Sequence, residues 1–292
     1  MSGSALEPIG PTIVRGAESF LLRAAHVDQT FQIDVMAPPG AAKKKLPVLY
    51  ITDASYGFGL AAQAISLMQF ARELPQIVVV GIGYPATLDA KQIRALRFRE
   101  FCPTEGKSYV ERIRRDMPGE IPDSVTPGGA NAFLSFIIDE LKPLIEARYP
   151  VDATDQTLVG MSLGGLFSLF ALFRAPGAFQ RVVALSPSIW WDERALLEQE
   201  ATFAKEAKDL AVNLFVSIGA LEEAAYLPAH MVTNLYAFDA NLRSRNYPRF
   251  RLAMEVFAGE THNSVYAGSL TRGLRTVFGT APGFSGWATP PR

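Results

Sequence analysis

The sequence predicts an α/β fold in which a mostly parallel central sheet is covered by helices on both faces and has an antiparallel N-terminal edge. Apolar runs rich in β-branched residues recur along the chain and indicate buried strands, at residues 46–52, 76–81, 157–160, 181–185, 212–218 and 250–257. Segments with helical spacing separate most of these runs, at 60–72, 131–149, 163–174, 192–208 and 224–244. This alternation is typical of parallel strands joined by crossover helices.

The N-terminal edge is predicted from residues 31–36, which alternate between apolar and polar side chains. The segment ends before Pro38 and Pro39, and a solvated turn of three lysines follows at 43–45. Alternation with a period of two is the pattern of a strand buried on one face, and proline interrupts a strand. We therefore expect an antiparallel hairpin at the edge of the sheet.

The organisation of the chain indicates one domain. No linker or internal repeat divides residues 1–292. The stretch 84–129 is the exception, because it is rich in proline, glycine and arginine and predicts a long irregular insertion. Loops of that length in a compact domain are usually functional or disordered. We expect the insertion to lie near the strand ends, where substrates bind in open α/β sheets.

Composition and charge exclude several classes of function. The chain has 292 residues, 49% of them hydrophobic, with 28 basic and 29 acidic side chains. This balance leaves no overall field to attract nucleic acid or an anionic membrane, so neither is expected as a partner. The one cysteine, Cys102, allows no intramolecular disulfide and no metal-site spacing, so we expect a structural thiol, no metal and no cofactor. Residues 1–11 lack a basic segment followed by an apolar one, which predicts a cytoplasmic location.

The strongest functional signal is Gly160-Met161-Ser162-Leu163-Gly164, which joins an apolar strand to a long apolar helix. A serine attacks an acyl carbon only if its oxygen stands clear of the backbone, and a tight strand-to-helix turn flanked by glycines achieves this. A glycine-rich turn before a buried helix would explain the glycines but not the serine between them. Ser162 is therefore the predicted nucleophile.

A neutral serine hydroxyl needs an adjacent base, most often a histidine that a carboxylate orients. Where the serine stands on such a turn, the acid and then the histidine follow it in the chain, which excludes His26. We favour His262, in a polar loop after the last predicted strand, over His230, which lies in a predicted helix.

The acid should follow the preceding predicted strand, where the sequence offers two adjacent carboxylates, Glu222 and Glu223. They cannot both point inward. We favour Glu222, hold Glu223 in reserve, and keep Asp192 as a rival because it also lies beyond a strand. The alternative interpretation of the pair is two glutamates that stabilise the first turn of a helix through its dipole.

Ester hydrolysis also requires donors for the oxyanion. One should be the backbone N–H of Leu163, directly after the nucleophile. The other should come from the loop after the strand that ends at Asp53, where Ala54 and Ser55 are the candidates.

Together these motifs resemble the putative-esterase family of the α/β-hydrolase superfamily, which contains S-formylglutathione hydrolase (esterase D) and enterobactin-type trilactone siderophore esterases. The resemblance runs from about residue 31 to 278 and rests on five stretches, 46–53, 160–165, 185–192, 219–222 and 259–262. It implies the α/β-hydrolase fold, a triad of Ser162, Glu222 and His262, and an oxyanion hole made by the N–H groups of Ser55 and Leu163. Many relatives have Asp-Gly where this chain has Asp53-Ala54, and this departure concerns the second donor.

The predicted function is a serine hydrolase that cleaves carboxylic esters of small molecules through an acyl-enzyme intermediate. The resemblance implies that Trp190 and Trp191 border the substrate pocket, although two adjacent tryptophans cannot share one direction, so we expect one to be core. The insertion is rich in arginine, above all Arg97 and Arg99, which would cradle an anionic ferric catecholate of the siderophore type or else form a solvated face. The other arginines of this set are Arg94, Arg112, Arg114 and Arg115.

Several alternatives stay open. The same triad would serve an acyltransferase or a thioesterase, and a hydrolase fold can also bind ligands without turnover. Residues 57–62 follow a strand, open with Gly57-Phe58-Gly59 and resemble a dinucleotide-binding fingerprint. A dehydrogenase would need an acidic residue at the end of the next strand, where this chain has Gly83, Tyr84 and Pro85.

Overall fold

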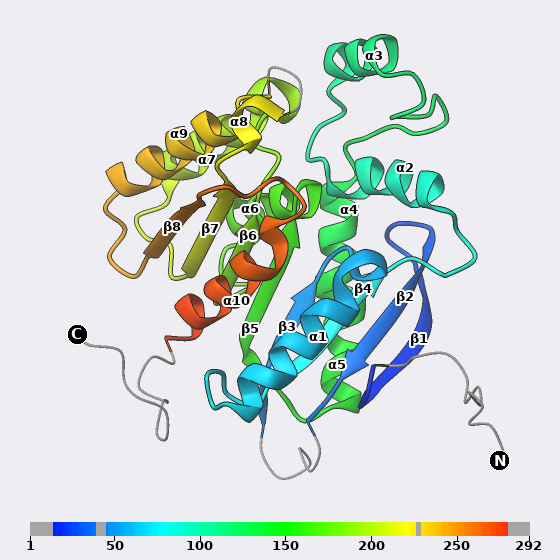
Figure 1. The fold of residues 1–292 in the computed structure, drawn as a ribbon, viewed down its shortest axis with the longest axis vertical. Helices are drawn as coiled ribbons and strands as arrows, with labels where there is room; N and C mark the ends of the chain where they lie inside the picture. The colour runs from blue at the N-terminus through cyan, green and yellow to red at the C-terminus, as the bar shows by residue number, and fades with distance from the viewer. Residues whose placement is uncertain (1–13, 39–44, 226–228, 280–292) are drawn as a thin grey trace, which may run out of the picture.

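One mixed sheet organises the molecule (Figure 1). The computed structural model describes residues 14–38, 45–225 and 229–279. In these residues the strands form an eight-stranded sheet in the order β1-β2-β4-β3-β5-β6-β7-β8. β2 pairs antiparallel with β1 and with β4, and every other neighbouring pair is parallel. The strand bounds are β1 Ala17–Ala24, β2 Gln29–Met36, β3 Leu46–Ile51, β4 Val78–Gly83, β5 Val151–Met161, β6 Arg181–Leu185, β7 Asn213–Gly219 and β8 Arg251–Phe257.

Helices cover both faces of the sheet. On one face α1 and α10 pack on the sheet through a core that includes Ile65 and Leu270, and Figure 1 shows this pair in front of the strands. The other face carries the larger core, to which α2 to α7 and α9 contribute. The helix bounds are α1 Ala54–Phe70, α2 Ala90–Phe101, α3 Lys107–Asp116, α4 Ala130–Ser135, the π-helical segment η2 Phe136–Leu141, α5 Lys142–Arg148, α6 Leu163–Arg174, α7 Trp191–Glu206, α8 Glu222–Ala225, α9 Met231–Ser244 and α10 Val265–Phe278.

The structure confirms the predicted α/β fold and its antiparallel N-terminal edge, but the edge is built differently. β2 makes its hairpin with β1, which precedes it, and β4 rather than β3 lies on its other side. β1 was not predicted because its sequence, AESFLLRA, has no regular alternation and most of its side chains are at least partly exposed. The predicted turn at 43–45 is not the hairpin turn; Lys43 and Lys44 lie outside the described residues.

Four of the five predicted helices have different bounds in the structure. The helix predicted at 192–208 is α7, which spans residues 191–206. α1 begins at Ala54, six residues before the prediction, because Asp53 takes a left-handed conformation and turns the chain directly from strand to helix. The helix predicted at 131–149 is a continuous helical run from α4 to α5 with a π-helical centre. The single helix predicted at 224–244 is divided between α8 and α9, with residues 226–228 outside the described part.

The stretch 84–129 is more regular than predicted, because it contains α2 and α3. Figure 1 shows both helices beyond the end of the sheet at which β3 leads into α1. α2 begins with a capping box, in which the Asp89 side chain accepts from Gln92 N and the Gln92 side chain accepts from Asp89 N. Its last turn is fastened to the sheet, because the buried Glu100 carboxylate accepts a hydrogen bond from Tyr84 Oη beside β4.

Glu100 predicts a pH dependence of stability. Burial raises the pKa of this carboxyl from 4.5 to about 7, although Arg99 beside it favours the charged form. The folded protein therefore binds an extra proton between these values, so its stability falls as pH rises through about 7. Glutamine does not titrate, so Glu100→Gln should lack this decline. Between pH 4.5 and 7 its free energy of unfolding should fall by on the order of 2 kcal/mol less than that of the wild type. Urea unfolding of both proteins at several pH values between the two pKa values measures it, and parallel profiles would contradict the assignment.

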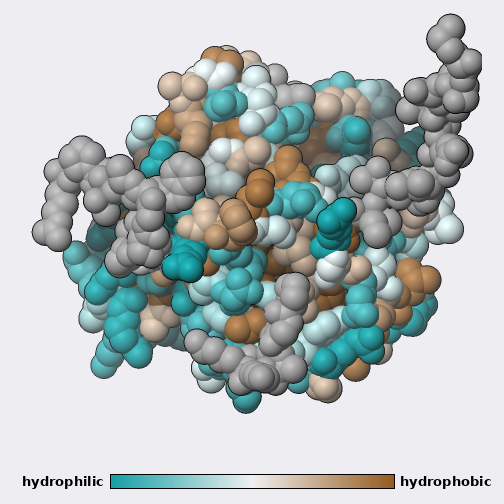
Figure 2. Space-filling model, turned by 60° about the horizontal axis from the view of Figure 1, so that its bottom comes forward, coloured by the Kyte–Doolittle hydropathy of each residue, from teal (hydrophilic) through white to brown (hydrophobic). Residues whose placement is uncertain are grey.

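The surface of the described residues mixes polar and apolar side chains. On the face shown in Figure 2, hydrophobic residues are interspersed with hydrophilic ones. None of the helices in the described part of the chain has both the length and the apolar character that a membrane span requires.

Candidate active site

Ser162 stands on a strained turn between β5 and α6. Its backbone has φ 60° and ψ −121°, a conformation that residues other than glycine seldom adopt. The turn closes tightly, because a Cβ on Gly160 would overlap the carbonyl group of Gly164 and one on Gly164 would overlap Thr52. Close approach of backbone therefore requires glycine at position 160, and the Thr52 side chain leaves little room for a Cβ at position 164. The turn leaves Ser162 on the wall of a cavity.

Gly160→Ala is expected to lower stability by about 3 kcal/mol or more, because the new methyl group meets backbone that cannot move without opening the turn. Gly268→Ala in α10 is the matched control. A Cβ there would meet only Phe257 Cε1 at 3.8 Å, so this variant should be neutral or slightly more stable. Thermal unfolding compares the two variants, and similar melting temperatures would contradict the steric argument.

Glu222 and His262 form a hydrogen-bonded pair in the lining of the same cavity. His262 Nδ1 lies 2.6 Å from Glu222 Oε2. The other carboxylate oxygen, Oε1, accepts hydrogen bonds from Ser186 Oγ and from Gly219 N, each at 2.7 Å. Glu222 is only 2% exposed, and burial of a carboxylate is costly unless the group is hydrogen-bonded. The three partners compensate for this cost.

The loop that carries His262 packs on the end of β7. Ala220 N donates to Phe257 O and Leu221 N donates to Glu260 O. This approach needs glycine at position 219, because a Cβ there would overlap the Glu260 carbonyl. The acid and the histidine are therefore held by two backbone segments in direct contact.

The hydrogen bond to Glu222 also fixes the state of the histidine. A carboxylate accepts, so Nδ1 carries a proton, and Nε2 is the ring nitrogen that can act as a base. Ser162, Glu222 and His262 all line one cavity of about 740 Å³. In the described residues Ser162 Oγ has one hydrogen-bond contact, 3.5 Å from Ser188 Oγ, and none with His262. Catalytic hydrogen bonds often tighten only when substrate is bound.

The other candidates for the acid and the base lie outside the cavity lining. Both Glu223 oxygens serve α9, since Oε2 accepts from Val232 N and Thr233 N and Oε1 from Thr233 Oγ1. His230 lies 3.4 Å from the same carboxylate and does not line the cavity. Asp192 also lies outside the lining, in a left-handed stretch at the start of α7. The structure thus brings together Glu222 and His262 and separates the others from them.

Comparison with known proteins identifies the family. The family model described as Putative esterase matches residues 24–269. The chain belongs to this putative esterase family. The chain is similar to the ferri-bacillibactin esterase BesA of Bacillus subtilis, with 32% identity over 272 residues that cover 90% of this chain and 89% of that protein. It is also similar to the siderophore triacetylfusarinine C esterase of Aspergillus fumigatus, with 30% identity over 261 residues, 80% of this chain and 82% of that protein.

A solved structure agrees with these relatives. The crystal structure of BES protein from Bacillus cereus matches with a TM-score of 0.77 and 28% identity, and the match covers 94% of this chain and 99% of that one. The chain is thus an ester hydrolase with the α/β-hydrolase fold.

The two adjacent tryptophans of the esterase point in different directions. Trp190 lines the cavity. Trp191 is 0% exposed, donates from Nε1 to Thr104 Oγ1 at 3.1 Å, and packs against Phe98 and Tyr109. Trp191 is therefore a core residue rather than a residue of the substrate pocket.

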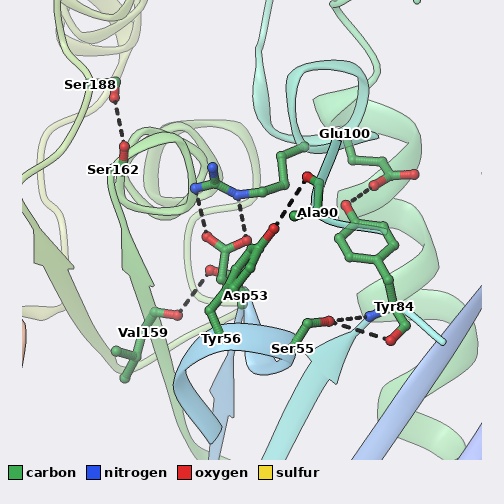
Figure 3. Close-up of polar contacts among 11 residues, drawn as sticks. Asp53, Ser55, Tyr56, Tyr84, Ala90, Glu100, Val159, Ser162 and Ser188 are labelled. Atoms are coloured by element: carbon green, nitrogen blue, oxygen red, sulfur yellow. Dashed lines mark hydrogen bonds and ion pairs between the residues drawn. The ribbon is translucent and has the colours of Figure 1, made fainter. Parts of the chain in front are cut away.

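Only one of the two expected oxyanion donors lies at the cavity. Leu163 opens α6 on the cavity wall, where the first amides of a helix have no acceptor within it. Ser55 belongs to the first turn of α1 and is not part of the lining. Its Oγ accepts from Tyr84 N at 2.7 Å, and Figure 3 shows it turned toward Tyr84 and away from Ser162. The Ser55 side chain therefore faces away from the site, and the backbone N–H of Ser55 or Ala54 as second oxyanion donor stays a prediction.

The two arginines expected to bind substrate differ in position. Arg97 lines the cavity, but its guanidinium forms two hydrogen bonds with Asp53, from Nε to Oδ1 at 2.6 Å and from Nη2 to Oδ2 at 2.9 Å. Arg99 lies outside the lining and pairs with Glu100 and Gln29. Arg99 is therefore removed from the candidate site.

Sequence reasoning missed three polar residues of the esterase site, Asp53, Ser186 and Ser188. Ser186 donates a hydrogen bond to Glu222, and Ser188 Oγ lies 3.5 Å from Ser162 Oγ. Asp53 accepts a hydrogen bond from Arg97. Their position in the chain was the available signal, because Ser186 and Ser188 come one and three residues after the end of β6, and Asp53 comes two residues after the end of β3.

In the described residues neither a metal site nor the dinucleotide-like pattern is supported. Among the residues that the structure describes, no group of three or more His, Cys, Asp or Glu side chains could hold a metal ion. Gly57 and Gly59 lie inside α1, and a Cβ on Gly57 would meet the Tyr266 hydroxyl, so packing explains the first glycine of the dinucleotide-like pattern. Cys102 is fully buried.

Proposed function

We propose that this esterase hydrolyses a bulky carboxylic ester through an acyl-enzyme, with Ser162 as nucleophile, His262 as base and Glu222 as the acid that orients it. The observation that carries the proposal is the 2.6 Å contact between His262 Nδ1 and Glu222 Oε2 in the cavity that Ser162 also lines. A serine on a strained turn, with an oriented histidine in the same cavity, is the arrangement of serine hydrolases.

The residues supply each step of the reaction. Ser162 Oγ attacks the carbonyl carbon while His262 Nε2 takes its proton. The oxyanion that forms accepts a hydrogen bond from the N–H of Leu163, and the positive charge on His262 is balanced by Glu222. The carbon–oxygen bond of the ester then breaks, and His262 returns the proton to the leaving alcohol. Water attacks the acyl-serine by the same route and releases the carboxylic acid.

The substrate we propose is a siderophore-type lactone or an ester of similar bulk. A cavity of about 740 Å³ is much larger than a short acyl group needs. Two of the relatives are named as siderophore esterases, ferri-bacillibactin esterase and triacetylfusarinine C esterase. Aromatic and aliphatic side chains, among them Phe98, Tyr109 and Trp190, form much of the wall and suit a large ring.

The test compares an iron-free cyclic trilactone with p-nitrophenyl butyrate. We expect kcat/KM for the trilactone to be higher by about tenfold or more, because contacts remote from the reacting bond are available only to the larger molecule. Chromatography with mass detection should show ring opening to a linear acid. Equal values of kcat/KM would contradict the proposed substrate class, and transfer of the acyl group to an acceptor other than water would contradict hydrolysis.

A further inference from the structure

The arginines of the insertion are neutralised by carboxylates of the same chain. Each of the six arginines between residues 94 and 115 lies within salt-bridge distance of an acidic side chain. The pairs are Arg94 with Glu120, Arg97 with Asp53, Arg99 with Glu100, Arg112 with Glu193, Arg114 with Asp123 and Arg115 with Asp116. A row of arginines that looks basic in the sequence therefore presents little uncompensated charge.

The arginines that line the cavity are also paired with carboxylates. Arg94 and Arg97 are the described arginines in its lining, and Asp53, Glu120 and Glu222 lie there too. Arg94 Nη1 lies 2.7 Å from Glu120 Oε2, and Arg97 is held by both oxygens of Asp53. Apart from His262, the described lining has three acidic side chains and two basic ones.

The neighbouring hollow does not add a positive field. It shares Trp190 with the cavity and has Arg112 and Arg194 in its wall, but Asp116 and Glu193 are there as well. Arg112 is paired with Glu193 at 3.6 Å. A carboxylate or catecholate entering either space would lose hydration and find the guanidinium groups of the cavity already occupied.

We propose that the cavity selects esters whose bound part carries no negative charge, and that Glu120 sets this preference by neutralising Arg94. The inference rests on the proposed esterase function and narrows its substrate class to uncharged esters rather than polyanionic ones. Within the described lining, apolar side chains suit such a ligand, among them Phe98, Ile113, Met117 and Met231.

Glu120 is the partner that can be removed without dismantling the site. The Arg97 side chain is only 17% exposed and is bound through two hydrogen bonds beside the turn that holds Ser162. The Arg94 side chain is 52% exposed and is bound by the single contact to Glu120. Glu120→Gln therefore keeps the size of the side chain and leaves Arg94 as an unpaired cation on the cavity wall.

Two matched aryl esters measure the preference. They are p-nitrophenyl p-methylbenzoate, which is neutral, and p-nitrophenyl p-carboxybenzoate, which has nearly the same shape and one negative charge. The wild type should have the higher kcat/KM for the neutral ester. In Glu120→Gln the ratio of anionic to neutral kcat/KM should rise by about threefold to tenfold at low salt, and less at high salt. The intrinsic reactivities of the esters cancel when this ratio is compared between proteins.

Two further variants separate the pair from general charge effects. Asp123→Asn removes a carboxylate of the same insertion that lies outside the cavity lining, and it should leave the ratio unchanged. Adding Arg94→Gln to Glu120→Gln should return the ratio to the wild-type value. An unchanged ratio in Glu120→Gln, or a wild type that prefers the anionic ester, would overturn the inference while the esterase function stood. Failure to cleave either ester would instead overturn the proposed function, and the preference with it.

Discussion

Ser162→Ala is expected to abolish ester turnover, with kcat reduced on the order of a millionfold. Without Oγ no acyl-enzyme can form, so the remaining rate comes from binding and from the oxyanion donor alone. The fold should persist, because Ser162 N still donates to Leu185 O and Leu166 N to Ser162 O, and neither hydrogen bond uses the side chain. Release of p-nitrophenol from an activated ester measures the rate.

A fluorophosphonate probe provides the control for Ser162. It should label the wild type and fail to label Ser162→Ala, while both proteins unfold at similar temperatures. Alanine in place of serine keeps the strained turn, so any loss of activity is chemical rather than structural. Retention of turnover or of labelling in the variant would exclude Ser162 as the nucleophile.

Glu222→Gln should have the second largest effect, a loss of about ten-thousandfold in kcat. Oε1 accepts from both Ser186 and Gly219, so the carbonyl oxygen of glutamine is expected to keep that position. Its amide nitrogen then faces His262 Nδ1, which must become an acceptor. The proton moves to Nε2, and the imidazole can no longer take the proton of Ser162.

Glu223→Gln is the matched control one residue away. Its carboxylate serves backbone and hydroxyl donors of α9 and lies outside the cavity lining, so turnover should be retained. A modest loss of stability is expected, on the order of 1 kcal/mol, because charge-assisted bonds at a helix start are weakened. If Glu223→Gln lost activity and Glu222→Gln kept it, the two roles would have to be exchanged.

The sequence was sufficient where the signal is local. The turn at Ser162 is visible because glycine, serine and the flanking apolar runs are contiguous, and α6 has the predicted bounds. Most of the parallel strands could be found for the same reason, since they contain short apolar runs, although only residues 157–160 of the eleven-residue strand β5 were predicted. The first strand could not, because an exposed edge strand such as β1 needs no regular apolar face.

The sequence could not show which of two adjacent side chains faces the cavity. Glu222 and Glu223 have the same chemistry, and only the short helix α8 decides which one faces His262. The same holds for Trp190 and Trp191. The sequence indicates that one of them is a core residue but not which one. The surroundings of Ser55 could not be read either, because the helix was expected to begin at residue 60, whereas Ser55 lies in the first turn of α1 and its hydroxyl contacts Tyr84 beside β4.

Charge partners were hidden for a different reason. Arg97 pairs with Asp53, 44 residues earlier, and Arg112 pairs with Glu193, far later in the chain. Counting arginines within one segment gives their number but not their neutralisation, which depends on how distant loops meet. A basic stretch is therefore weak evidence for an anionic ligand until the fold is known.

The proposed chemistry and the proposed selectivity reside in separate parts of the chain. Ser162, Glu222 and His262 follow the ends of β5, β7 and β8, whereas residues of α2 and α3 close one wall of the cavity. Mutation within the insertion can therefore alter which molecules are accepted without disturbing how the bond is broken. Homologues could therefore diverge in substrate through substitutions in that one segment. Exchange of the segment between homologues would be a way to engineer the substrate preference.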